Sequence, residues 1–161
     1  MRRTIIMPKP VDKIEFWKER IETATRPHFS VYVANDNLWN RINESHEKIL
    51  KDTIKGKVLD AGCGYGRWAK LFDEYTGIDF SPDFIEIAKK KNPGKLFIRA
   101  DLKNIPFEDK EFDWAFCVSI KKMVEDNLGS DSWKQMQEEL KRVAKNVLIL
   151  EYEDYMSKEI I

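Results

Sequence analysis

The chain has 161 residues, 28 basic and 28 acidic, so its formal net charge is zero. This length favours one domain. The balanced charge argues against a broad nucleic-acid surface, which a partner protein would have to supply. Hydrophobic residues make up 42% of the chain, so a packed core is expected rather than disorder. The sequence has no apolar run of the ~18–20 residues that cross a bilayer, so no membrane partner is expected. Cys63 and Cys117 provide no disulfide framework, which is typical of the reducing cytoplasm.

The first 56 residues are predicted to form an N-terminal arm and a helical cap. Two prolines favour an extended arm over residues 1–10. Apolar residues spaced three and four apart predict a helix over residues 12–24. Asn35 and Asp36 are good N-cap residues and predict the start of a second helix.

Residues 57–161 are predicted to form an α/β core. Helical patterns cover residues 65–74, 82–91 and 131–144. Short apolar runs, each typical of a strand, lie at Lys57–Ala61, Tyr75–Asp79, Lys95–Ala100, Phe112–Val118 and Asn146–Glu151. This alternation predicts a doubly wound, mostly parallel sheet with five main strands and helices on both faces.

The first predicted strand ends in a glycine-rich segment. Asp60 is followed by glycine at positions 62, 64 and 66. Glycine permits a tight turn and lets a ligand approach the backbone closely. We expect the amides at the start of the following helix to offer hydrogen-bond donors.

Acidic residues also end the next two predicted strands. Asp79 is placed to accept hydrogen bonds from both hydroxyls of a ribose. Asp101 is placed to accept from an adenine amine, while Phe80 and Leu102 would enclose the two faces of the base. In open α/β sheets, ligands bind outside the carboxyl ends of the strands. The pattern therefore predicts an adenosine-containing cofactor.

The glycine spacing distinguishes between two such cofactors. A dinucleotide-binding loop reads Gly-x-Gly-x-x-Gly, and here Arg67 stands at the third glycine position. The Asp60 carboxylate would repel a pyrophosphate, but it can help to hold a cationic amino-acid group directly or through water. S-adenosylmethionine is therefore favoured over a nicotinamide dinucleotide.

Three segments together resemble the class I S-adenosylmethionine-dependent methyltransferases. They are residues 58–66, 77–82 and 100–113, and the resemblance extends over residues 57–151. It implies that the cofactor's methionine part contacts Gly62, Cys63 and Gly64, that the ribose contacts Asp79, and that adenine contacts Asp101 and Leu102.

The resemblance also implies in-line methyl transfer to a small or medium-sized acceptor, without a metal ion. Neither the acceptor nor the accepting atom can be named, because the Leu-His-His segment common in small-molecule members of this family is absent. Two alternatives stay open. One is a regulatory or partner subunit that binds the cofactor without catalysis, and the other is a nicotinamide-dependent oxidoreductase.

Few residues are candidates for a general base or an acceptor-binding group, and methyl transfer need not use a base. His28 and Tyr32 could fold over the cofactor, while Lys121 and Lys122 follow the fourth strand, where the acceptor should lie. Cys117 is grouped with the cofactor-binding residues, although a buried strand position is the preferred interpretation.

The fifth predicted strand ends near Glu151. The family usually continues with another helix and an antiparallel pair of strands, which residues 152–161 are too few to form. An uncovered strand edge is prone to unwanted pairing. We therefore expect the tail, the N-terminal arm or a second subunit of a homo-oligomer to cover this edge.

Overall fold

The computed structural model describes residues 36–151 and 159–160. The predicted arm and the predicted helix over residues 12–24 lie outside the described residues, as do His28 and Tyr32. The chain divides into two compact units, Met1–Trp39 and Asn40–Ile161, and the second unit carries the sheet.

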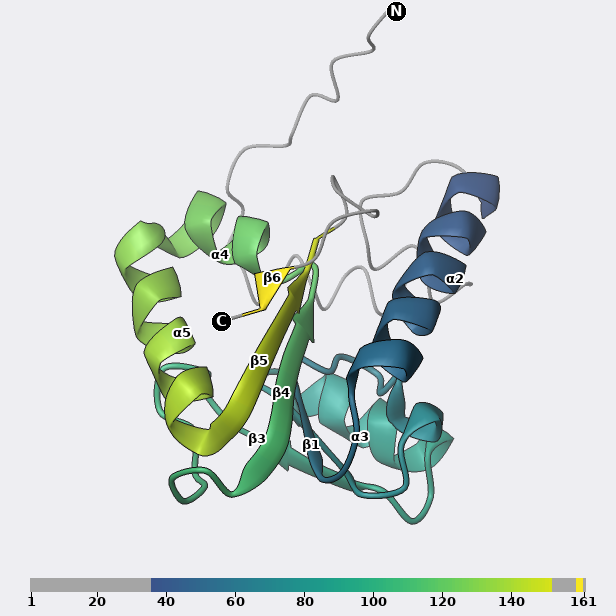
Figure 1. Cartoon of the computed structure of the whole chain (residues 1–161), viewed down its shortest axis with the longest axis horizontal. Helices are drawn as coiled ribbons and strands as arrows, with labels where there is room; N and C mark the ends of the chain where they lie inside the picture. Colours follow the sequence, from purple (N-terminus) through teal and green to yellow (C-terminus); the bar gives the residue numbers. More distant parts are fainter. Residues whose placement is uncertain (1–35, 152–158, 161) are drawn as a thin grey trace, which may run out of the picture. The chain divides into compact units, whose positions relative to one another are not determined.

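Six strands form one sheet in the order β3-β2-β1-β4-β5-β6 (Figure 1). The first five strands are parallel to their neighbours and the sixth is antiparallel. Their bounds are β1 Val58–Ala61, β2 Tyr75–Asp79, β3 Leu96–Arg99, β4 Phe112–Val118, β5 Ala144–Leu150 and β6 Glu159–Ile160. The predicted doubly wound α/β fold with five main parallel strands is confirmed.

The tail covers part of the edge of the fifth strand. In β6, Ile160 pairs with Leu148 and Glu159 pairs with Ile149. Of the three candidates for covering this edge, the structure thus shows the tail in place at these two positions. An antiparallel strand of this kind supplies partners for backbone groups that would otherwise offer a template for aggregation.

Helices cover both faces of the sheet in the second unit (Figure 1). The helices are α2 Asp36–Thr53, α3 Pro82–Lys91, α4 Lys121–Leu128 and α5 Ser130–Val143. Successive strand residues point to opposite faces, so two separate cores form. One core contains Val124, Trp133 and Leu140 from α4 and α5. The other contains Leu50 of α2 and Ile85 of α3.

The second unit includes most of α2, a helix that the sequence pattern grouped with the N-terminal cap. Leu50 is fully buried and Ile54 is 2% exposed, both in the same core as Val58 of β1. Burying side chains of this size typically stabilises a fold by about 1.5–3 kcal/mol each. The packing of this apolar face explains why the helix belongs with the sheet.

The predicted helix over residues 65–74 is wrong. The segment consists of turns and a single turn of 3₁₀ helix, η2, over Ala69–Leu71. Gly64 and Gly66 have φ angles of 52° and 75°, which a right-handed helix cannot accommodate. Phe72 then adopts an extended conformation that ends the turn. The loop after β1 therefore does not lead into an α-helix, and no helix dipole points at a ligand there.

Gly66 allows a close approach between this loop and β3. A Cβ atom at Gly66 would lie 2.7 Å from the Phe97 ring and 2.7 Å from Asn92 Nδ2. Gly94 has a similar positive φ of 87°, but no atom lies within 4 Å of the same position. The two glycines therefore share the backbone requirement and differ in steric space.

We predict that Gly66→Ala lowers the free energy of unfolding by about 1–3 kcal/mol more than Gly94→Ala does, because only the first creates an overpacked contact. Each substitution should also cost about 1–2 kcal/mol for the left-handed backbone. Urea denaturation of both variants measures the difference. Equal losses would contradict the close approach to Phe97.

Candidate cofactor site

The sequence-predicted cofactor residues gather where the sheet changes direction. From β1 the chain proceeds outward through β2 and β3, and then returns to place β4 on the other side of β1. Asp60 pairs with Gly77 on one side and with Phe116 on the other. The loop that follows β1 therefore lies at the switch point, which is the usual ligand site of open α/β sheets.

The amides of the glycine loop already have partners within the protein. The N–H groups of Gly62 and Cys63 both donate to the carbonyl of Ile78, at 2.8 and 2.9 Å. The Gly64 N–H donates to the Asp79 carboxylate at 3.0 Å. A phosphate site needs free N–H groups, and these three are engaged. A carbonyl oxygen has two lone pairs, so the loop carbonyls can still accept from an ammonium group where they already bind within the protein, as the Cys63 carbonyl does with the Gly66 N–H at 2.9 Å.

Asp79 organises the end of β2. Its Oδ2 accepts from Gly64, and its Oδ1 accepts from the Ser81 N–H at 2.9 Å. The Ser81 hydroxyl in turn caps α3 by accepting from Phe84 N. Burial raises the pKa of the Asp79 carboxyl, and the amide hydrogen bonds oppose that rise. The carboxylate is thus held in one orientation beside the glycine loop.

Residues from β2 and β3 meet beside Asp79. The Ala100 N–H donates to the Asp79 carbonyl at 3.0 Å, and Arg99 Nε donates to the Phe80 carbonyl at 3.1 Å. Phe80 is 44% exposed, unusually so for a large apolar side chain. Asp101 is also exposed, whereas Leu102 is 9% exposed. This edge offers an aromatic face and a carboxylate together.

Asp60 lies inside the protein rather than at its surface. It is 2% exposed, and its carboxylate accepts a 2.7 Å hydrogen bond from the Tyr75 hydroxyl. Burial raises its pKa to about 7, against the opposing effects of Tyr75 and the nearby Arg67 charge. The structure therefore places Asp60 below the loop as a buried group that titrates near neutral pH.

Arg67 connects the loop to α2. Its guanidinium donates to Asn43 Oδ1 at 2.9 Å and lies 4.3 Å from the centre of the Trp68 ring. His46 of the same helix is fully buried. Burial and the Arg67 charge lower the pKa of His46 to about 4, so the imidazole is neutral at pH 7. His46 is therefore a neutral, buried residue of α2.

Ser119, directly after β4, is not among the site residues predicted from the sequence. Ser119 has a left-handed φ of 61°, and its buried hydroxyl has no hydrogen-bond partner among the described residues. Ile120 packs close to Gly62, because a Cβ atom added at Gly62 would lie 2.5 Å from Ile120 Cδ1. This turn therefore borders the glycine loop. Strained residues and unsatisfied polar groups concentrate at functional sites.

The start of α4 is occupied by an acidic side chain of the chain itself. The N–H groups of Lys121 and Lys122 donate to the Glu151 carboxylate, at 2.9 and 3.4 Å. Lys122 Nζ also lies 3.2 Å from Asp126 Oδ2 within the helix. The helix start is thus neutralised by Glu151 instead of being open to an anionic acceptor.

The two cysteines take structural positions. Cys117 is fully buried within β4 and belongs to the core under α4 and α5, which supports the preferred interpretation as a buried strand residue. Cys63 is 6% exposed, and burial together with Asp60 and Asp79 raises the pKa of its thiol. Neither cysteine forms a disulfide.

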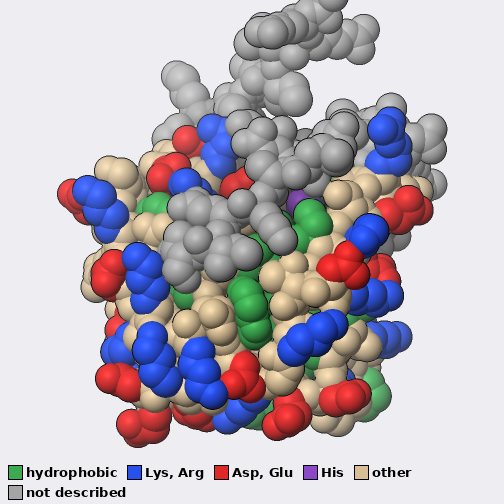
Figure 2. All heavy atoms as spheres, in the orientation of Figure 1, with side chains coloured by type: hydrophobic (Ala, Val, Ile, Leu, Met, Phe, Trp, Pro, Cys, Tyr) green, Lys and Arg blue, Asp and Glu red, His purple; other side chains and the backbone are tan. Residues whose placement is uncertain are grey.

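On the face in Figure 2, Lys and Arg side chains are interspersed with Asp and Glu side chains over α4 and α5. Within residues 36–151 and 159–160, no helix is both long and apolar enough to cross a membrane. The same residues contain no cluster of three metal-ligating side chains.

Comparison with known proteins places this geometry in a family. The model of a family described as a methyltransferase domain matches residues 59–150, more than half of the chain. The chain is 35% identical over 122 residues to the uncharacterized protein MJ1123 of Methanocaldococcus jannaschii, covering 73% of this chain and 56% of that relative. It is 31% identical over 111 residues to phthiotriol/phenolphthiotriol dimycocerosates methyltransferase 1 of Mycobacterium ulcerans, covering 63% and 41%.

Solved structures show the same fold. The PH0226 protein of Pyrococcus horikoshii is 25% identical with a TM-score of 0.62, covering 84% of this chain and 64% of that one. A putative S-adenosylmethionine-dependent methyltransferase of Methanococcus maripaludis shares the fold, with a TM-score of 0.63, 21% identity and coverage of 90% and 67%. The chain belongs to the class I S-adenosylmethionine-dependent methyltransferases. It spans about half the length of the curated relatives it matches.

The described residues fit the cofactor of this family, S-adenosylmethionine. No atom lies within 4 Å of a Cβ built on Gly64, so the loop is open at that point. The N–H groups of Gly62, Cys63 and Gly64 are engaged, the loop carbonyls can accept from an ammonium group, and the exposed Phe80 provides a surface for a base. These features suit a cationic amino acid joined to adenosine.

The buried Asp60 makes stability depend on pH with a defined sign. Its pKa is raised from 3.8 to about 7 in the folded protein, so the fold is favoured while Asp60 is protonated. That stability is fully present below pH 3.8 and is lost as the pH rises through about 7. His46 acts in the opposite direction, because its pKa is lowered to about 4.

We compare the free energy of unfolding of Asp60→Asn with that of the unsubstituted protein. We predict that the difference shifts in favour of Asp60→Asn by about 2–3 kcal/mol as the pH rises from 5 to 8. Taking the difference between the two proteins cancels the contribution of His46. Urea denaturation at both pH values measures the difference in the free energy of unfolding. Asp73→Asn, at an exposed position, is the control. If both variants follow the unsubstituted protein in parallel, Asp60 does not titrate in this range.

Proposed function

We propose that the chain binds S-adenosylmethionine and transfers its methyl group to a small or medium-sized acceptor. The observation that carries the proposal is the glycine loop, in which the N–H groups of Gly62, Cys63 and Gly64 are engaged within the protein beside the buried Asp79 carboxylate. The cofactor supplies an activated methyl group on a positively charged sulfur. The protein then has to bind, orient and align the two reactants, which can lower the barrier by about 7–11 kcal/mol.

In this proposal each end of the cofactor meets a different part of the site. Backbone groups of Gly62, Cys63 and Gly64 contact the methionine part, with the Asp60 charge below them. Asp79 accepts from the ribose hydroxyls, while Phe80, Asp101 and Leu102 bind adenine. The support is the hydrogen bonds that hold these segments side by side at the switch point.

The nicotinamide alternative is disfavoured by the same loop. A pyrophosphate would need free N–H groups and a helix N-terminus. The loop amides donate to Ile78 and Asp79 instead, and only a 3₁₀ turn, η2, follows them. The buried Asp60 would add electrostatic repulsion when ionised.

We propose Ser119 as the residue nearest the methyl acceptor. It lies at the carboxyl end of β4, next to the loop that holds the methionine part, and its hydroxyl has no partner among the described residues. A hydroxyl in this place can donate to or accept from an acceptor molecule. Lys121 and Lys122 are weaker candidates, because the Glu151 carboxylate already binds their amides at the helix start and Lys122 Nζ pairs with Asp126.

The proposed setting is the cytoplasm, with a small molecule as the acceptor. Two free buried cysteines among the described residues are consistent with a reducing compartment. The interspersed charges on the face in Figure 2 would bind nucleic acid only weakly without a partner protein. Relatives named as methyltransferases of phthiotriol and phenolphthiotriol dimycocerosates or of malonyl-acyl-carrier protein support an acceptor other than nucleic acid.

The ribose contact gives the sharpest test. We predict that S-adenosylhomocysteine binds the unsubstituted protein at least about tenfold more tightly than its 2′-deoxy analogue does, since a hydrogen bond to a carboxylate contributes about 1.5–3 kcal/mol. In Asp79→Asn this ratio should fall below about threefold. Isothermal titration calorimetry measures both affinities for each protein.

The test uses the ratio of the affinities for S-adenosylhomocysteine and its 2′-deoxy analogue, because Asp79 also binds the amides of Gly64 and Ser81. A purely structural role would weaken both ligands equally and leave their ratio unchanged. Glu86→Gln, an exposed substitution on α3, is the matched control and should retain the ratio of the unsubstituted protein. An unchanged ratio in Asp79→Asn would remove the ribose role.

A further inference from the structure

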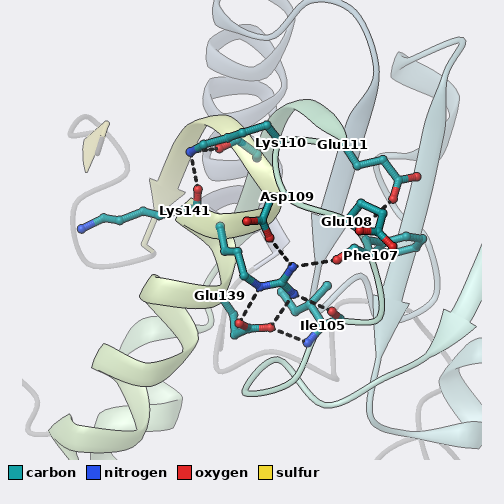
Figure 3. Close-up of polar contacts among 10 residues, drawn as sticks. Ile105, Phe107, Glu108, Asp109, Lys110, Glu111, Glu139 and Lys141 are labelled. Carbon is teal, nitrogen blue, oxygen red and sulfur yellow. Dashed lines mark hydrogen bonds and ion pairs between the residues drawn. The ribbon is translucent and has the colours of Figure 1, made fainter.

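An ionic clamp joins α5 to the segment between β3 and β4. Figure 3 shows Glu139 beside Ile105, with Phe107 and Asp109 close by. Glu139 Oε2 accepts from the Ile105 N–H at 2.8 Å, while Arg142 donates to the Ile105 carbonyl, also at 2.8 Å. The Ile105 peptide groups are therefore held on both sides by two residues of one helix turn.

The clamp extends beyond Ile105. Arg142 also donates to the Phe107 carbonyl at 2.8 Å and to Asp109 Oδ1 at 3.0 Å. Two further bonds, at 2.8 and 2.9 Å, join its guanidinium to Glu139 in a bidentate pair. The pair lowers the pKa of the Glu139 carboxyl and keeps it ionised. Bidentate arginine–carboxylate contacts fix geometry as well as charge.

A tight turn connects the clamp to the proposed adenine site. Asp101 Oδ1 accepts from the Lys103 N–H at 2.9 Å, and the Asp101 carbonyl accepts from the Asn104 N–H at 3.0 Å. Ile105, the clamped residue, follows immediately and is 2% exposed. The turn that begins at Asp101 therefore follows β3 directly, and the residue after the turn, Ile105, is held by α5.

From this chain of contacts we infer that Arg142 and Glu139 are positioning residues for adenine recognition. They set the place of the Asp101 carboxylate, and so decide how well the site distinguishes an exocyclic amine from a carbonyl on the purine. The inference rests on the proposed function, because it assumes that adenine lies against Asp101 and Leu102. Arg142 itself does not contact the cofactor.

Arginine suits this positioning role because its guanidinium can bind several carbonyls at once. Lysine could not hold Ile105, Phe107 and Glu139 together, since it lacks the planar fork. Arg142 is 32% exposed and Glu139 is 20% exposed, so the clamp is partly shielded from salt. A role confined to stability would leave purine selectivity unchanged.

The test compares S-adenosylhomocysteine with S-inosylhomocysteine, in which a carbonyl replaces the adenine amine. Affinities for both ligands are measured by isothermal titration calorimetry in the full chain. We expect the unsubstituted protein to bind S-adenosylhomocysteine more tightly than S-inosylhomocysteine. In Arg142→Met the ratio of the two affinities should fall by roughly tenfold. Arg142→Lys should lose a smaller part, and Glu139→Gln should also lose part of it.

Lys145→Met is the matched control, because it removes a cation from a 2.7 Å ion pair with Asp113 away from the turn. It should keep the preference of the unsubstituted protein. If Arg142→Met does not fold, Arg142→Lys and Glu139→Gln provide the same comparison. Equal weakening of both ligands, or no change in their ratio, overturns the inference. If the unsubstituted protein binds neither ligand, the proposed function itself fails.

Discussion

The Ile78 carbonyl is the point on which the site depends, because it accepts the N–H groups of both Gly62 and Cys63. This pair of hydrogen bonds, together with Gly64 bound to Asp79, uses the donors that a phosphate would require. It also fixes the loop against the end of β2. The same contacts therefore decide what the loop can bind and where the Asp79 carboxylate stands.

Burial of Asp60 and Asp79 beside this loop disfavours their ionised forms, and the surrounding hydrogen bonds offset this effect only in part. Asp60 and Asp79 both have raised pKa values because they are removed from water. Tyr75 bonds to one and two backbone amides bond to the other. Carboxylates placed in this way favour a cationic ligand, whose charge would stabilise their ionised forms.

Much of the fold could be predicted from local pattern, because each strand is a short apolar run bounded by polar or glycine residues. The helix at 82–91 and the strand at 112–118 match the observed α3 and β4. The segment after β1 was predicted wrongly, since its apolar spacing is helical while Gly64 and Gly66 are left-handed. Backbone angles of this kind depend on the loop's contacts with β2 and β3, which spacing alone does not reveal.

The candidate site could likewise be predicted only in part. Strand-end acids and glycines indicated the cofactor region, because parallel strands bring their carboxyl ends together. The buried position of Asp60 depends on Tyr75, a contact across two strands. Arg142 reaches carbonyls 35 and 37 residues away in the chain, and no local pattern marks it. Ser119 is an ordinary residue in sequence, and only its φ of 61° and its buried hydroxyl distinguish it.

We propose that this loop recognises a cationic amino acid joined to adenosine and rejects a pyrophosphate. Titration of the protein with S-adenosylmethionine, S-adenosylhomocysteine and NAD measures this directly. The structure predicts that both sulfur ligands bind, and that each binds at least about a hundredfold more tightly than NAD, a difference of ~2.7 kcal/mol. Binding of NAD with equal or greater affinity would contradict the account.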